Sequence, residues 1–228
     1  MMQSKIDFDR SISEVVYLNN IAQTDSNNDK IYFKVIILLL CAKLEKFVKD
    51  STNEYITSLL SLNLTKEQLP PAFVKEVIKN EVQKIDEKTV ERYVENTRCQ
   101  ERSKVFSLIW DSKYILKNLE KDDFVVSISN NGTTEFKDTY KKIGLPDIIN
   151  NLSDYQQETN IGGLITSTTA YPIVERINKV IKLRHEIIHD DATPNITKNE
   201  IDLYVEIFKN FVEQIDTVLT QKLSEYQN

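Results

Sequence analysis

Hydrophobic positions recur at helical spacing over most of this chain. Residues 5–23 carry apolar side chains three and four positions apart, which predicts an amphipathic helix. The polar segment 24–29, rich in Asp and Asn, predicts a break with capping residues. A second helix is predicted from residue 30 to about 62. Its centre, residues 35–42, is apolar on every side, a pattern typical of a helix buried on most sides.

A proline pair, Pro70–Pro71, interrupts the helical pattern that follows. Proline cannot sit inside a helix, so the pair predicts a connection. The helical pattern resumes from about residue 72 to 84. It appears again from 88 to 119, which predicts a further helix there.

The middle of the chain has a weaker pattern. Residues 122–136 contain β-branched side chains and an Asn-Gly dipeptide, which favour an irregular or hairpin-like excursion. A short helix is expected from about 135 to 143, ending at Gly144. Residues 150–170, which include Gly162–Gly163, are expected to be loop-like.

Two helices are predicted at the end of the chain. Pro172 suits the first turn of a helix, and one apolar stripe continues from Ile173 to Ile188. Thr197 is then a candidate N-cap, because Glu200 follows three residues later and completes a capping box. The last helix is expected over about 198–226.

The composition agrees with a helical fold. The chain has 228 residues, and 40% of them are hydrophobic, which is enough for a real core. Only 4 Gly and 5 Pro are present, which disfavours a sandwich or barrel. We therefore predict one all-α domain over residues 1–228, a helical bundle with an irregular middle insertion at about 120–170.

The charge and the cysteine content restrict the possible binding partners and the cellular compartment. The net charge of -6 argues against nonspecific binding to nucleic acid, although a local basic groove remains compatible with it. Cys41 lies in an apolar run and is expected to be a buried thiol; with Cys99 it makes only two cysteines. The N-terminus resembles neither a signal nor a transit peptide, and the longest apolar run is far too short to span a bilayer. We expect a cytoplasmic protein without membrane contact.

Both histidines of the chain lie in one heptapeptide, RHEIIHD, residues 184–190. Arg184 follows Val180 by four residues and Ile181 by three, so it continues the apolar stripe. A guanidinium there must be paired, or must face a cleft or an interface. His189 is expected at the end of the helix, where the dipole favours the imidazolium form.

An arginine with a histidine suits phosphoryl transfer on RNA. The ribose 2′-OH is a built-in nucleophile, histidine can carry its proton, and arginine can stabilise charge on the phosphate oxygens. That reaction needs no metal or cofactor, and we expect neither, since the chain is interpreted as having no H-E-x-x-H motif, no cysteine cluster and no Walker loop. The alternative is that these residues have no catalytic role, because basic side chains are common near helix C-termini. The spacing alone favours that alternative.

The sequence around the motif favours the catalytic interpretation over the structural one. RINKVIKLRHEIIHD resembles the signature of HEPN domains, in which an arginine and a histidine end the penultimate helix. The upstream run VIILLLCAKLEKF resembles the early helix of the RiboL-PSP branch of that superfamily, and LPPAF and KKIGLP are similar to it too. The resemblance covers about residues 30–222.

The resemblance implies an α-helical homodimer with a composite active site. Many HEPN proteins are metal-independent endoribonucleases of toxin–antitoxin, CRISPR-linked or phage-defence systems, and they leave a 2′,3′-cyclic phosphate. Carried over, Arg184 and His189 are the catalytic pair. His185 departs from the polar Asn that is frequent at its position, and it is either an auxiliary histidine or a sign of drift.

Further residues are weaker candidates. Glu45 could pair with Arg184 and orient it, or it could form an ordinary salt bridge or be a solvated carboxylate. A basic series could form an RNA-facing strip, although such a series is more often a solvated helix face. Its members are Arg92, Arg98, Arg102 and Lys104.

Three functions remain open at this point. The leading hypothesis is an endoribonuclease that acts as a toxin or antiviral-defence effector. The main rival is a noncatalytic HEPN-like dimerisation or scaffold subunit, in which the Arg-His pair holds the dimer together. A third is a toxin that depends on an antitoxin or another partner. No residue pattern identifies the RNA substrate.

Overall fold

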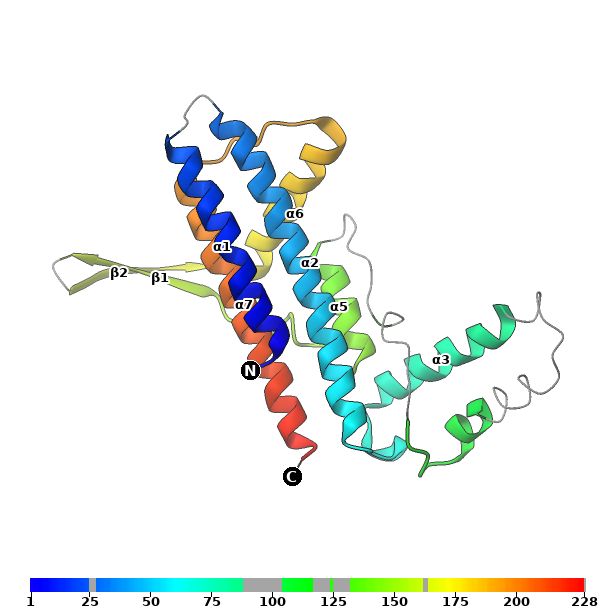
Figure 1. Ribbon diagram of the computed structural model, residues 1–228. Coiled ribbons are helices and arrows are strands. Elements are labelled where there is room, and N and C mark those ends of the chain that lie inside the picture. The colour runs from blue at the N-terminus through cyan, green and yellow to red at the C-terminus, as the bar shows by residue number, and fades with distance from the viewer. Residues whose placement is uncertain (25–27, 88–103, 117–123, 125–131, 162–163, 228) are drawn as a thin grey trace.

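Two neighbouring helices, α1 (Gln3–Thr24) and α2 (Asp29–Ser61), form one side of the computed structural model (Figure 1). They run in opposite directions and confirm the first two predicted helices. On α2, Ile36 and Ile37 are fully buried, whereas Val35 is 40% exposed. The apolar centre of α2 is therefore buried on most sides but not on all.

The structure describes most of the chain, and all structural statements below concern these residues. They are 1–24, 28–87, 104–116, 124, 132–161 and 164–227.

The last two helices complete the core. The two helices predicted at the end of the chain are confirmed as α6 (Ile173–Asp190) and α7 (Lys198–Glu225), and they pack against α2 and against each other. The capping box of α7 is confirmed. The Thr197 hydroxyl accepts from the backbone N–H of Glu200 at 3.3 Å, and the Glu200 carboxylate accepts from that of Thr197 at 2.9 Å.

The middle segment also contributes to the core through α5 (Thr133–Lys142). Phe136 and Tyr140 of this helix are buried, and the Tyr140 hydroxyl lies 3.2 Å from the Ser51 hydroxyl of α2. The chain leaves α5 through Gly144, whose φ of +91° only glycine adopts readily. The predicted short helix and its stop are thus confirmed. The excursion predicted before it falls largely on 125–131, which lie outside the described residues.

A β-hairpin replaces the loop expected at residues 150–170. Strand β1 (Tyr155–Ile161) pairs antiparallel with β2 (Leu164–Tyr171), and Figure 1 shows the hairpin extending away from the helices. The prediction was wrong because exposed polar residues line β2, as in Ser167, Thr168 and Thr169. A strand that lies against no core lacks the alternation that reveals strands in sequence.

The opposite side of the molecule is built by the short helix η1 (Lys66–Gln68), α3 (Pro71–Glu87) and a helical segment over 104–110. The connection predicted at Pro70–Pro71 is confirmed, with Pro71 as the first residue of α3. Figure 1 shows α3 pointing away from the bundle formed by α1, α2, α6 and α7.

The predicted helix 88–119 is wrong at its end. Residues 88–103 and 117–119 lie outside the described part, but the helix stops at Trp110. Asp111 then accepts a hydrogen bond from the backbone N–H of Lys113 at 2.9 Å, and Ile115 forms a bridge with Thr65. A local turn and a distant backbone partner, neither visible as periodicity, end this helix. No described helix is long and apolar enough to cross a membrane.

Candidate active site

Arg184 lies on the apolar face of α6, between the buried residues Ile181 and Ile187. Val180 and Ile181, one turn earlier, are buried, and the Arg184 side chain is 26% exposed. Its Nη2 atom lies 3.5 Å from Oε1 of Glu45 on α2. The guanidinium that continues the apolar stripe is therefore paired, as the sequence required, and its partner is the carboxylate that the sequence proposed for it.

The ion pair is loose and leaves Glu45 poorly satisfied. Oε1 of Glu45 is buried and accepts no hydrogen bond from the described residues. Burial raises the pKa of Glu45, the charge of Arg184 lowers it, and nearby Glu135 raises it again; the net direction is upward. A guanidinium carries five N–H donors. One long ion pair leaves Arg184 able to bind a further anion.

The two histidines lie side by side. His185 and His189 are four residues apart, so they face nearly the same direction on the helix. Their ring centroids are 4.3 Å apart, with 47° between the ring planes. His189 is exposed, whereas Nδ1 of His185 is buried without a hydrogen-bond partner in the described structure. The sequence-based prediction placed His185 relative to Arg184 alone. The spacing of four residues already indicated its contact with His189.

Residues 185–189 also have the spacing H-E-x-x-H, which in zinc peptidases places two histidine ligands on one helix face. The expectation of no metal site rested partly on the absence of this spacing, and that part was wrong, because residues 185–189 contain it. Glu186, its acidic member, lies 3.8 Å from Lys182. Among the described residues, no group of three or more His, Cys, Asp or Glu could hold a metal ion. The described part of one chain thus supplies the histidine pair without a third protein ligand.

The end of α6 is fixed against the start of α2. Asp191 has a left-handed φ of +48°, which ends the helix, and the N–H of Ala192 donates to the carbonyl of Glu186 at 3.2 Å. Lys34 of α2 donates to the Asp191 carbonyl at 2.8 Å and to its carboxylate at 2.6 Å. These bonds hold His189 in the last turn of α6, where the sequence placed it.

Cys41 lies next to the site, but its thiol is unreactive. Its thiol is 2% exposed and lies 3.9 Å from the Val180 carbonyl. Burial raises the pKa of Cys41 to about 12, so the thiol keeps its proton and is a poor nucleophile. The prediction of a buried thiol is confirmed; Cys99 lies outside the described residues.

Of the proposed basic strip, the described part of the chain contains only Lys104. Arg92, Arg98 and Arg102 lie outside the described residues. Lys104 is described, and its ammonium pairs with Glu81 of α3 at 2.8 Å. Its charge is therefore largely compensated, on the side of the molecule that carries α3.

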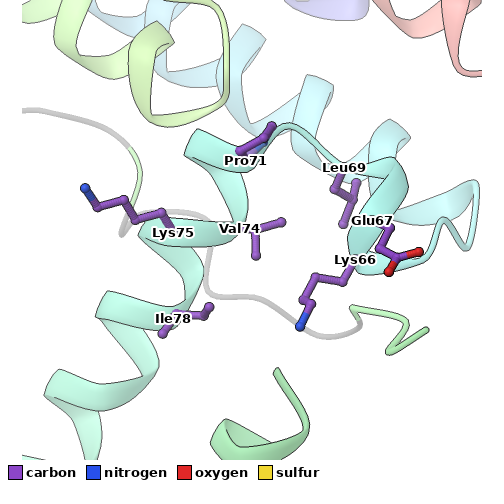
Figure 2. Close-up of a pocket in the computed structure, with 7 residues that line it drawn as sticks. All are labelled: Lys66, Glu67, Leu69, Pro71, Val74, Lys75 and Ile78. Carbon is purple, nitrogen blue, oxygen red and sulfur yellow. The ribbon is translucent and has the colours of Figure 1, made fainter. Parts of the chain in front are cut away.

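A pocket of about 410 Å³ lies in that same region, between η1 and α3 (Figure 2). Leu69, Val74 and Ile78 give it an apolar wall. The ammonium of Lys66 at its rim donates to two backbone carbonyls, those of Leu108 and Ile109. The pocket includes neither the arginine nor the histidines, so it is not the reaction centre indicated by the sequence.

Comparison with known proteins gives one match. A family model described as RiboL-PSP-HEPN matches residues 6–221. No curated protein and no solved structure matches the chain significantly. The matched range includes α2 with Glu45 and α6 with Arg184, His185 and His189, so it covers every element that builds the site.

Proposed function

The chain belongs to the RiboL-PSP-HEPN family, and on that premise we propose that it is a metal-independent endoribonuclease. HEPN proteins are typically ribonucleases. The observation that carries the proposal is the arrangement at the end of α6. A loosely paired arginine and two adjacent histidines lie on consecutive turns of one helix that is fixed at its end.

In the proposed mechanism, His189 removes the proton of a ribose 2′-OH. The 2′-oxygen then attacks the adjacent phosphorus, the bond to the 5′-oxygen breaks, and a proton is returned to that leaving oxygen. Arg184 binds the non-bridging oxygens and stabilises the charge that grows on them. The products are a 2′,3′-cyclic phosphate and a 5′-hydroxyl.

Two neighbours have supporting roles in this proposal. Glu45 orients the guanidinium of Arg184 from across the α2–α6 contact, at 3.5 Å. His185 is an auxiliary proton carrier, since its ring lies 4.3 Å from that of His189. A base and an acid are both required in the reaction, and adjacent histidines can divide these tasks.

We further propose that the active protein is a homodimer with a composite site. Exposed apolar side chains near the site support this: Ile31 and Val35 on α2 are 61% and 40% exposed, and Ile188 beside His189 is 51% exposed. The Lys34–Asp191 pair joins these two helix ends. A second copy that covers the three side chains would bring its own Arg184 and His189 near the first.

The biological role that we propose follows from the family alone. It is a cytoplasmic toxin or antiviral-defence effector, controlled by an antitoxin or a defence-complex partner. Induced expression should slow bacterial growth with the wild-type chain and not with Arg184→Ala. Equal growth inhibition by both chains would contradict a role that depends on cleavage.

An RNA cleavage assay in excess EDTA tests the enzymatic proposal. The wild-type protein should cleave single-stranded RNA, leave cyclic phosphate ends, and spare an oligonucleotide of the same sequence with 2′-deoxyribose throughout. Cleavage of the deoxy oligonucleotide would exclude the 2′-OH mechanism. Absence of any RNA cleavage would favour the alternative below.

The alternative is a noncatalytic HEPN-like dimerisation or scaffold subunit of a defence or toxin–antitoxin complex. The Arg184–Glu45 pair favours it to some extent, because a pair that joins two helices is also a structural device. Size-exclusion chromatography separates the two functions. An Arg184→Ala protein that no longer dimerises supports the scaffold, whereas an intact but inactive dimer supports the enzyme.

A further inference from the structure

The histidine pair has an environment that suits a second ligand class. Both rings lie in the last two turns of α6, with centroids 4.3 Å apart; His189 is exposed and His185 is half-buried. Nδ1 of His185 is buried and has no hydrogen-bond partner within the described structure. Among the described residues, no carboxylate or carbonyl fixes this ring through Nδ1.

Two imidazoles one helical turn apart form a chelating pair for transition metals. Imidazole nitrogen suits Zn²⁺, Cu²⁺ and Ni²⁺, and the H-E-x-x-H spacing puts two such nitrogens on one face of a helix. The described residues of one chain add no third protein ligand, so water completes the coordination. Such a site binds reversibly, unlike a closed structural zinc site.

We propose that His185 and His189 form a transition-metal site, and that an ion bound there inhibits the protein. The ion occupies the nitrogen lone pairs that proton transfer requires, because a metal-bound imidazole nitrogen accepts no proton. The inhibitory half of this proposal rests on the proposed ribonuclease function. The binding half rests only on the geometry of the two rings.

The composition makes the binding test clean. The chain has 2 histidines in total, so in a protein without a histidine tag every imidazole signal belongs to this pair. During a Zn²⁺ titration followed by NMR, the Hε1 resonances of both histidines should change together and saturate at the same metal ratio. A Cys99→Ser background removes a thiol that could compete for the ion.

The His185→Asn variant provides the comparison. It should lose zinc binding, which calorimetry detects without RNA, while His189 remains free and visible by NMR. Binding that survives in His185→Asn, or a wild-type titration that leaves either histidine unchanged, overturns the proposal. The exposed Lys182→Ala on the same helix is the matched control and should bind zinc as the wild type does.

Cleavage measurements test the inhibitory half separately. Zinc should suppress RNA cleavage by the wild-type protein, and EDTA should restore it. Any cleavage that remains in His185→Asn should be insensitive to zinc. Zinc binding with no cleavage under any condition means that the ribonuclease proposal fails and the metal site stands. If RNA is cleaved but the histidine resonances do not respond to zinc, the metal-site proposal fails and the ribonuclease proposal is supported.

Discussion

The two halves of α6 show how one helix combines a structural part with a chemical part. Each half carries an arginine. Arg176 lies over the ring of Tyr171, with its guanidinium carbon 5.3 Å from the ring centroid, whereas Arg184 faces the carboxylate of Glu45. Nε of Arg176 is also buried and has no hydrogen-bond partner among the described residues. An unsatisfied arginine is therefore no sign of chemistry by itself, and its neighbours decide its role.

The neighbours differ clearly between the halves. In the N-terminal half, Asn178 accepts a hydrogen bond from the backbone N–H of Thr133 at 2.9 Å, and Ile177 is fully buried. These contacts tie α6 to α5 and to the core. In the C-terminal half, the arginine lies beside an under-bonded carboxylate and is followed by two adjacent histidines. Substitutions in each half test whether the N-terminal half of α6 is structural and the C-terminal half catalytic.

The largest effect is expected from His189→Ala. Loss of the proposed general base should lower the rate of RNA cleavage by about 10²- to 10⁴-fold. Because His189 is exposed, the melting temperature should barely change. Cleavage rate and thermal unfolding of the same preparation check this. If His189→Ala still cleaved RNA at the wild-type rate, the C-terminal half of α6 would have no catalytic role.

The N-terminal half should respond in the opposite way. Ile177→Ala leaves a cavity at a fully buried position and should reduce the free energy of unfolding by about 2–5 kcal/mol. Molecules that remain folded should cleave RNA at close to the wild-type rate. Urea unfolding and cleavage at low temperature measure the two quantities. A large catalytic loss in the folded fraction would mean that the halves are not separable.

Arg184→Lys should have an intermediate effect. Lysine keeps the positive charge but loses the planar fork that can bind two phosphate oxygens together, so cleavage should fall by about tenfold. Single-turnover rates at saturating RNA isolate this step. An unchanged rate would show that charge alone suffices, and that the geometry of the guanidinium is unimportant.

The smallest effect concerns Glu45 and pH. Its pKa is raised in the folded protein, so the folded state holds this proton more tightly than the unfolded chain does. Its contribution to stability is therefore greatest at low pH and decreases as the pH rises through the unfolded and then the folded pKa. Relative to the wild type, Glu45→Gln should gain stability between pH 4 and pH 7. Melting temperatures across that range test the direction; an opposite trend would mean that Arg184 dominates the environment of Glu45.

The sequence predicted those parts of the structure that have a periodic or local signal. The apolar stripe predicted α6, and Thr197 with Glu200 predicted the start of α7. The hairpin was missed because its exposed polar strand residues carry no alternating pattern. The end of the helix at Trp110 was missed because a turn and a partner some 50 residues distant in the chain set it.

The candidate site shows the same limit. The position of Arg184 in line with buried residues follows from helical spacing, and so does the contact between His185 and His189. The pairing with Glu45 joins residues that are far apart in the chain, so no periodicity could reveal it. The sequence indicated only a carboxylate next to a buried helical run, and the packing of α2 against α6 brings it to Arg184.

The matched arginines allow the most direct test of the central claim. Cleavage of single-stranded RNA in EDTA should be measured for the wild type, Arg184→Ala and Arg176→Ala, with folding checked by circular dichroism. We expect Arg176→Ala to cleave nearly as fast as the wild type. Arg184→Ala should be slower by about 10²- to 10³-fold while equally folded. Equal rates for the two variants, or no cleavage by the wild type, would contradict a ribonuclease centre at the end of α6.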